Sequence, residues 1–164
     1  MTITRTLTGL AIAAAFVAIA PVAANAATGT SDAVTAGSAA TTWGSYYAPG
    51  KAAKAFGSLK ATGEDHADIP TADTVKISGK VYDLTRKSSC GWAVFRVTYR
   101  NASGDLPFKH RSVLDCSYGT PKNFTFKYHD VYQVELKVCS EPKAAKPSLN
   151  CLYAGTWKTL YLSK

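Results

Sequence analysis

The sequence predicts an all-β protein: a small antiparallel, immunoglobulin-like β-sandwich with two disulfides and an N-terminal arm. Three observations predict this class. From Thr74 onward, apolar and polar residues alternate with the period of two that is typical of half-buried strands. Turn-forming stretches such as "NASGD" separate the alternating runs. All four cysteines lie in the same region, as expected of a disulfide-stapled exported domain.

Residues 1–26 have the organisation of a signal peptide. Arg5 precedes the apolar run of residues 10–20, and Ala24-Asn25-Ala26 matches a cleavage site. A retained membrane anchor is the alternative, but a spanning helix needs about 20 apolar residues. We therefore expect a secreted, extracellular protein. Residues 27–40 are small and polar, which predicts disorder.

Residues 41–73 form the predicted N-terminal arm, which ends in the acidic turn "GEDHADIPTAD". Ala52, Phe56 and Leu59 fall at helical spacing after Pro49-Gly50 and predict one short helix. An isolated helix of that length is marginal in water, so it would need a surface to fold against.

Residues 74–164 form the predicted β-sandwich domain, with six strands over 74–84, 90–100, 109–117, 123–130, 131–139 and 156–164. The first is expected at a sheet edge because of its lysines and Gly79. The alternation predicts which side chains share the apolar faces of the first five strands: Val75, Ile77, Val81, Ala93, Phe95, Val97, Tyr99, Leu114, Cys116, Phe124, Phe126, Tyr128, Tyr132, Val134, Leu136 and Val138.

The even number of cysteines predicts two disulfides in an exported chain. No C-x-x-C or C-x-x-H spacing supports a zinc site, so no metal is expected at these residues. Of the three possible connectivities, we favour Cys90–Cys116 and Cys139–Cys151, because each pair staples neighbouring elements across a connection.

The charge pattern indicates solvated strand faces. Removing Arg5 with the signal peptide lowers the formal net charge from +8 to +7, and lysines and arginines alternate with apolar residues. No run of five or more like charges marks a nucleic-acid-binding tail. We therefore expect no nucleic-acid partner.

Two histidines offer the best candidates for catalysis. A small basic ribonuclease could use His110 and His129 as acid and base, with Lys109 or Arg111 steadying phosphate charge. Nothing in the sequence places these histidines together, and both also fit solvent-facing strand positions. We therefore expect a protein that is not an enzyme.

The acidic residues give no stronger signal for catalysis or metal binding. A glycosidase would need paired carboxylates, and Asp115, Asp130 and Glu135 are scattered near strand ends. The acidic turn could coordinate calcium but lacks EF-hand spacing. No cofactor motif is present in the sequence, so none is expected.

The aromatic residues of the arm carry the clearest functional signal. Trp43, Tyr46, Tyr47 and Phe56 are of the types enriched in interface cores. They could fold back onto an edge or open face of the sandwich. We expect instead that the arm, or an edge strand, docks into another protein by strand addition.

The plan resembles small secreted proteins of actinobacteria, through the arm "WGSYYAPGKAAKAFGSL" and a two-disulfide domain opening "KISGKVYDL". One group that it looks like is the adaptor subunit of secreted umbrella toxin particles, which joins a lectin-like subunit to a large stalk-forming toxin chain. The resemblance implies an N-terminal extension that engages one partner while the β-sandwich engages another. It points to a partner-contacting set on the arm: Trp43, Tyr46, Tyr47, Pro49 and Phe56.

Two functional hypotheses follow, besides the remote one of a small basic secreted nuclease. The first is a secreted, non-enzymatic adaptor that binds other secreted proteins in a hetero-oligomer and has no membrane contact after signal cleavage. The second is an extracellular protease inhibitor that presents the loop "SEPKAAKPSLN", residues 140–150, with Lys143 or Lys146 entering an acidic pocket.

Overall fold

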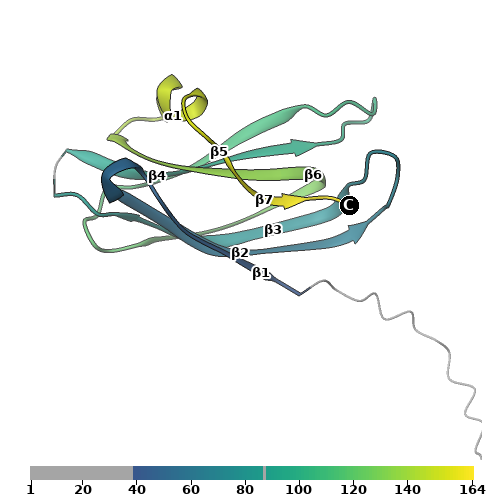
Figure 1. Cartoon of the computed structure of the whole chain (residues 1–164), viewed down its shortest axis with the longest axis horizontal. Helices are drawn as coiled ribbons and strands as arrows, with labels where there is room; N and C mark the ends of the chain where they lie inside the picture. Colours follow the sequence, from purple (N-terminus) through teal and green to yellow (C-terminus); the bar gives the residue numbers. More distant parts are fainter. Residues whose placement is uncertain (1–38, 87) are drawn as a thin grey trace, which may run out of the picture. The chain divides into compact units, whose positions relative to one another are not determined.

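The structure, a computed structural model, describes residues 39–86 and 88–164 (Figure 1). This part is almost entirely antiparallel β-sheet, which confirms the predicted all-β class. The predicted signal peptide, residues 1–26, and most of the segment 27–40 lie outside the described residues. The strands are β1 (Thr41–Tyr47), β2 (Ala53–Glu64), β3 (Ala72–Asp83), β4 (Ser89–Tyr99), β5 (Phe108–Asp115), β6 (Lys122–Pro142) and β7 (Lys158–Leu162). Two short helices, η1 (Pro49–Lys51) and α1 (Leu149–Tyr153), accompany them.

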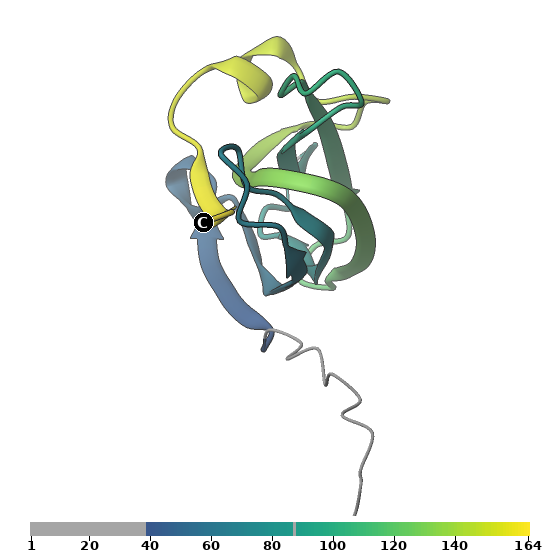
Figure 2. The same cartoon turned by 90° about the vertical axis from the view of Figure 1, so that its right-hand side faces the viewer.

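The long strand β6 belongs to both layers of the fold. Val131 pairs with Ala72 of β3 on one side and with Tyr99 of β4 on the other, so β3 and β4 flank β6 from opposite sides. The first half of β6 continues the layer β1-β2-β3, whereas its second half pairs with β4, which leads on to β5. Figure 2 shows β6 curving from one layer into the other.

The two strands predicted over 123–130 and 131–139 are therefore one strand, which corrects the prediction. The alternation of side chains slips at their junction: Asp130 has a left-handed φ of 53°, and the register with β4 shifts between Thr98 and Tyr99. A bulge of this kind bends a strand without ending it. The sequence pattern resembled a turn because both a turn and a bulge interrupt the period of two.

The core lies between the two layers. The predicted inward faces of β3, β4 and the second half of β6 are confirmed, because Ile77, Phe95 and Leu136 are fully buried there. On β5 the prediction was wrong: Val113 reaches this core, whereas Leu114 packs in a second cluster around Trp92. The other face of β5 therefore also carries buried apolar surface.

Residues 41–47 and 53–64, most of the predicted arm, are the strands β1 and β2 of the sheet. β1 pairs with β2, and β2 pairs with β3 along almost its whole length. The expected helix is wrong beyond its first turn: Pro49–Lys51 form the short helix η1, whereas Phe56 and Leu59 lie in β2. The buried positions of β2 alternate and are mostly alanines, whose weak apolar character hid the strand period: Ala53, Ala55, Leu59 and Ala61.

β3 is an interior strand between β2 and β6, so the predicted edge position is wrong. The glycine at position 79 is explained by packing and not by an edge position. It lies directly opposite Gly57 on β2, and a Cβ built on either glycine would lie 3.0 Å or less from Cζ2 of Trp43. The ring of Trp43 stacks on Phe124 and meets Phe95 edge-on, with centroids 6.3 and 5.9 Å apart. The two glycines thus leave room for this ring.

Both predicted disulfides are confirmed. Cys90–Cys116 joins the start of β4 to the residue after β5, and Cys139–Cys151 joins β6 to α1. Within the described residues, no helix has the length and apolar character needed to cross a membrane.

Candidate binding groove

The structure divides the five predicted partner-binding residues. Trp43 is only 7% exposed and belongs to the core, so it is not available to a partner. Phe56 lies half-buried and stacks on Tyr82, with ring centroids 5.9 Å apart. The other three predicted residues line one groove: Tyr46, Tyr47 and Pro49.

This binding groove has a volume of about 580 Å³ and separates the end of β1 from the second half of β6. One wall carries Tyr46 and the 48%-exposed Tyr47. The opposite wall is formed by residues 136–141 of β6, and residues from the segment 150–158 complete the lining. The groove is therefore a seam between the two layers, where no strand pairing closes the fold.

The wall formed by β6 includes an unpaired strand edge. β7 pairs with β6 only from Gln133 to Leu136, on the side opposite β4. Beyond Leu136, within the described residues, β6 is paired with β4 alone. We call residues 137–141 the β6 edge. Because backbone groups of alternate residues point to opposite sides of a strand, about half of its N–H and C=O groups face away from β4.

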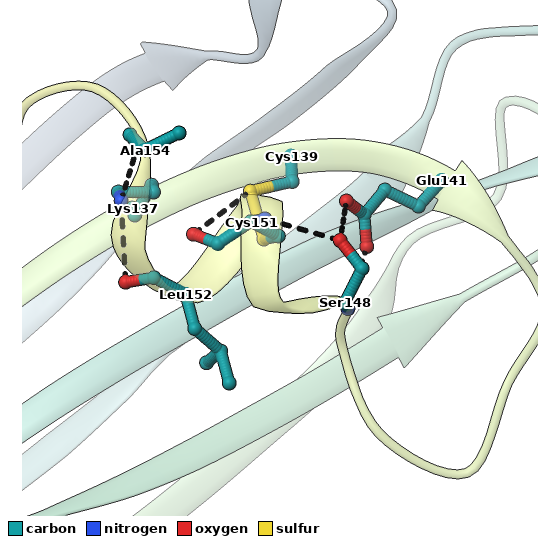
Figure 3. The surroundings of a disulfide bond; sticks show 7 residues. All are labelled: Lys137, Cys139, Glu141, Ser148, Cys151, Leu152 and Ala154. Atoms are coloured by element: carbon teal, nitrogen blue, oxygen red, sulfur yellow. Dashed lines mark hydrogen bonds between the residues drawn. A yellow bond between two sulfur atoms is a disulfide. The ribbon is translucent and has the colours of Figure 1, made fainter.

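The β6 edge is held by the disulfide loop, residues 139–151 (Figure 3). Besides the disulfide, Ser148 donates from its backbone N–H and its hydroxyl to the two carboxylate oxygens of Glu141, at 2.9 and 2.5 Å. The same hydroxyl caps α1 by accepting from the backbone N–H of Cys151 at 3.2 Å. The loop is thus closed twice, covalently and by hydrogen bonds.

Lys137 binds the segment 152–157, which follows the disulfide loop. Its ammonium donates to the carbonyls of Ala154 and Leu152, at 2.6 and 3.4 Å (Figure 3). It also lies 4.5 Å from the ring centroid of Trp157. Burial, followed by the nearby charge of Arg96, lowers the pKa of Lys137. Its role in the structure is to anchor residues 152–157 against β6.

The residues predicted for a nuclease have separate surroundings. His110 stacks on Trp157, with centroids 5.7 Å apart and ring planes 10° apart. His129 instead contacts β3, with Nδ1 3.2 Å from the hydroxyl of Thr74 and 3.0 Å from the carbonyl of Asp73. The ammonium of Lys109 and the guanidinium of Arg111 lie over aromatic rings. These contacts give the two histidines no common neighbour.

The acidic candidates also have structural partners. Asp115 is buried and accepts the backbone N–H groups of Asp83 and Ser117, while Glu135 pairs with Arg96 at 2.7 Å. In the acidic turn, the backbone N–H of Thr71 and then the guanidinium of Arg100 hold the pKa of Asp65 far below its usual range. The described part of the chain contains no cluster of three potential metal ligands.

Sequence reasoning found one wall of the groove through its tyrosines and missed the other. Ser148, three residues before Cys151, is the one signal that could have located α1, because serine is a preferred N-cap residue. The β6 edge left no signal, since it depends on where β7 stops pairing. Family models, curated proteins and solved structures yield no match to this chain.

Proposed function

We propose that this protein is a secreted, non-enzymatic adaptor that joins other extracellular proteins, and that the binding groove receives an extended segment of one partner. The proposal rests on one observation: two exposed residues, Tyr47 and Pro49, line the same groove as an unpaired strand edge. The disulfides are consistent with an extracellular location.

Strand addition fits this arrangement. An added strand would pair with the free backbone groups of the β6 edge, while its alternate side chains would pack against Tyr46 and Tyr47. The disulfide and the Ser148–Glu141 hydrogen bonds hold the edge in place beforehand. A pre-ordered edge loses less conformational entropy on binding, which favours affinity.

The adaptor role requires a second contact surface. A partner strand in the groove would leave the outer faces of both layers free for another subunit. The toxin-type assembly that the sequence resembles has this arrangement of two different partners around a small linking subunit. We therefore propose a hetero-oligomer.

The test is capture of partners from the native culture supernatant by the purified protein and by Tyr47→Ala. Tyr118→Ala is the matched control, because Tyr118 is 51% exposed and Tyr47 is 48% exposed. We expect a partner that the wild type and Tyr118→Ala retain and that Tyr47→Ala loses. Hydrogen exchange should then show new protection of amides in residues 137–141. A partner that binds without protecting these amides would contradict docking in the groove.

A second candidate function, protease inhibition, is favoured by the double closure of the disulfide loop. Lys143 and Lys146 lie on its exposed stretch, residues 142–146. A rigid loop of this kind suits the active site of a protease that cleaves after lysine. Inhibition of a trypsin-like protease that is lost in Lys143→Ala, Lys146→Ala would place this function first. Undiminished activity of the protease at a large excess of the wild-type protein would exclude it for that class.

A further inference from the structure

The outer face of the β1-β2-β3-β6 layer carries a row of three lysines in register. Lys60 of β2 lies directly opposite Lys76 of β3, which lies directly opposite Lys127 of β6. We call these three residues the lysine row. All three are exposed, and neighbouring strands lie about 4.8 Å apart. Like charges placed directly opposite each other on a sheet repel and destabilise it.

In the described part of the sheet, the two rows that flank the lysine row contain no acidic residue. The neighbouring row on one side contains Ser58, Ser78 and Thr125, and the row on the other side contains Thr62, Thr74 and His129. Within the described residues, the only two ion pairs are Arg96–Glu135 and Arg100–Asp65, which involve none of the three lysines. The nearest carboxylate in register, Glu64, accepts a hydrogen bond from the hydroxyl of Tyr161.

The rows together form a line of ammonium groups with hydroxyls on both sides. Thr125 and Ser78 are already oriented, since their hydroxyl oxygens lie 3.1 Å apart. Lys80 adds a fourth exposed cation two rows away. Ammonium groups are point charges that bind phosphate without the planar geometry that arginine imposes. A phosphate seated on the line could contact one lysine and one hydroxyl at once.

The two aromatic residues of this face on β2 and β3 are occupied, whereas the exposed Tyr47 lies opposite Lys54, away from the lysine row. Phe56 and Tyr82 stack on each other, and the ammonium of Lys54 lies 5.4 and 4.5 Å from their ring centroids. Proteins that bind single-stranded nucleic acid usually provide free aromatic rings on which bases stack. Among the described residues of this face, the rows beside the lysine row contain hydroxyls and His129 but no free Phe, Tyr or Trp ring.

We propose that the lysine row binds a linear phosphodiester polymer without bases, of the polyol-phosphate type, through its phosphate groups alone. Repulsion within the row is relieved when the polymer neutralises it, so the row is a binding feature rather than an ordinary solvated face. None of the three lysines lines the binding groove. The outcome of this test is therefore independent of strand docking in that groove.

The experiment is isothermal titration calorimetry of the purified full chain with poly(glycerol phosphate) of defined length, over a series of salt concentrations. The test variant is Lys60→Ser, Lys76→Ser, Lys127→Ser, and the matched control is Lys51→Ser, Lys143→Ser, Lys146→Ser, which removes the same charge from other exposed positions. We expect the test variant to bind about 100-fold more weakly, since each lysine near an anionic surface contributes roughly a factor of five. The slope of log K against log salt concentration should become shallower by about 2, because each of the three lost phosphate contacts contributes about 0.7 to that slope.

The control variant should keep its affinity within about fivefold, since it leaves the row intact. Lys60→Arg, Lys76→Arg, Lys127→Arg should also bind, which would show that charge in the row is what matters. Equal weakening in the test and control variants would overturn the proposal, because net charge alone would then explain binding. Single-stranded DNA or poly-glutamate bound more than about tenfold tighter at equal charge would also overturn it.

Discussion

At the scale of single residues, Gly57 and Gly79 determine whether Trp43 can enter the core. They lie opposite each other on β2 and β3, below the Trp43 ring. A Cβ at Gly79 would lie 2.5 Å from the carbonyl oxygen of Phe56 and 2.8 Å from Cζ of Phe124. Backbone atoms cannot move aside as a flexible side chain can, so the site has no room for a methyl group.

We predict that Gly79→Ala lowers the free energy of unfolding by about 1–3 kcal/mol, the usual cost of overpacking. Urea denaturation followed by tryptophan fluorescence measures it. Ser58→Ala is the control, because it lies in the adjoining strand and removes atoms rather than adding them. A Gly79→Ala protein as stable as the wild type would show that the ring does not lie over the glycine.

The surroundings of His110 predict that the stability of the protein depends on pH. It stacks on Trp157 and contacts Tyr153 and Phe108, with Arg96 and Lys137 as the nearby cations and Glu135 paired to Arg96. Burial, then Arg96 and Lys137, lower the pKa of His110 below 6.5. The unfolded chain therefore binds this proton more readily than the folded chain.

It follows that stability should fall as the pH drops below the unfolded value of about 6.5, and should level off below the lowered folded pKa. Melting temperatures measured from pH 7.5 to 5 should show this slope in the wild type. His110→Gln should flatten it, while His129→Gln should leave it in place. An unchanged slope in His110→Gln would assign the dependence to another group.

At the scale of elements, the disulfide loop holds the β6 edge and α1 together. The two cysteines are separated by 12 positions in the sequence, whereas Cys90 and Cys116 are separated by 26. In the chain-entropy model, the cost of losing a disulfide rises slowly with the length of the loop that it closes. The shorter loop should therefore contribute less to global stability and more to the local order of the groove.

Replacing Cys139 and Cys151 together by alanine should lower the free energy of unfolding by about 3 kcal/mol, and replacing Cys90 and Cys116 by about 3.5 kcal/mol. Thermal denaturation of the two variants compares them. Amide exchange of residues 137–141 should accelerate more in the first variant than in the second. The reverse order of acceleration would mean that the disulfide does not position the β6 edge.

At the scale of the whole molecule, the sequence predicted the strands whose buried residues are strongly apolar. Alternating Val, Ile and Phe residues allowed β3 and β4 to be predicted as strands, whereas the alanine-rich sequence of β2 led to the prediction of a helix. The sequence predicted a partner-binding role for Tyr46, Tyr47 and Pro49. It did not predict that they line one groove. The β6 edge and the lysine row depend on strand order and register, which no local pattern encodes.

Because the first half of β6 pairs with β3 and its second half pairs with β4, detaching β6 breaks a ladder in each layer. The domain should thus lose its structure in a single cooperative transition, with amides of β3 and β4 exchanging through the same global opening. Most contacts also join residues that are distant in the sequence, so loops must close before either layer gains stability. We therefore expect the pairing of β6 with both β3 and β4, which joins the two layers, to be a slow step of folding.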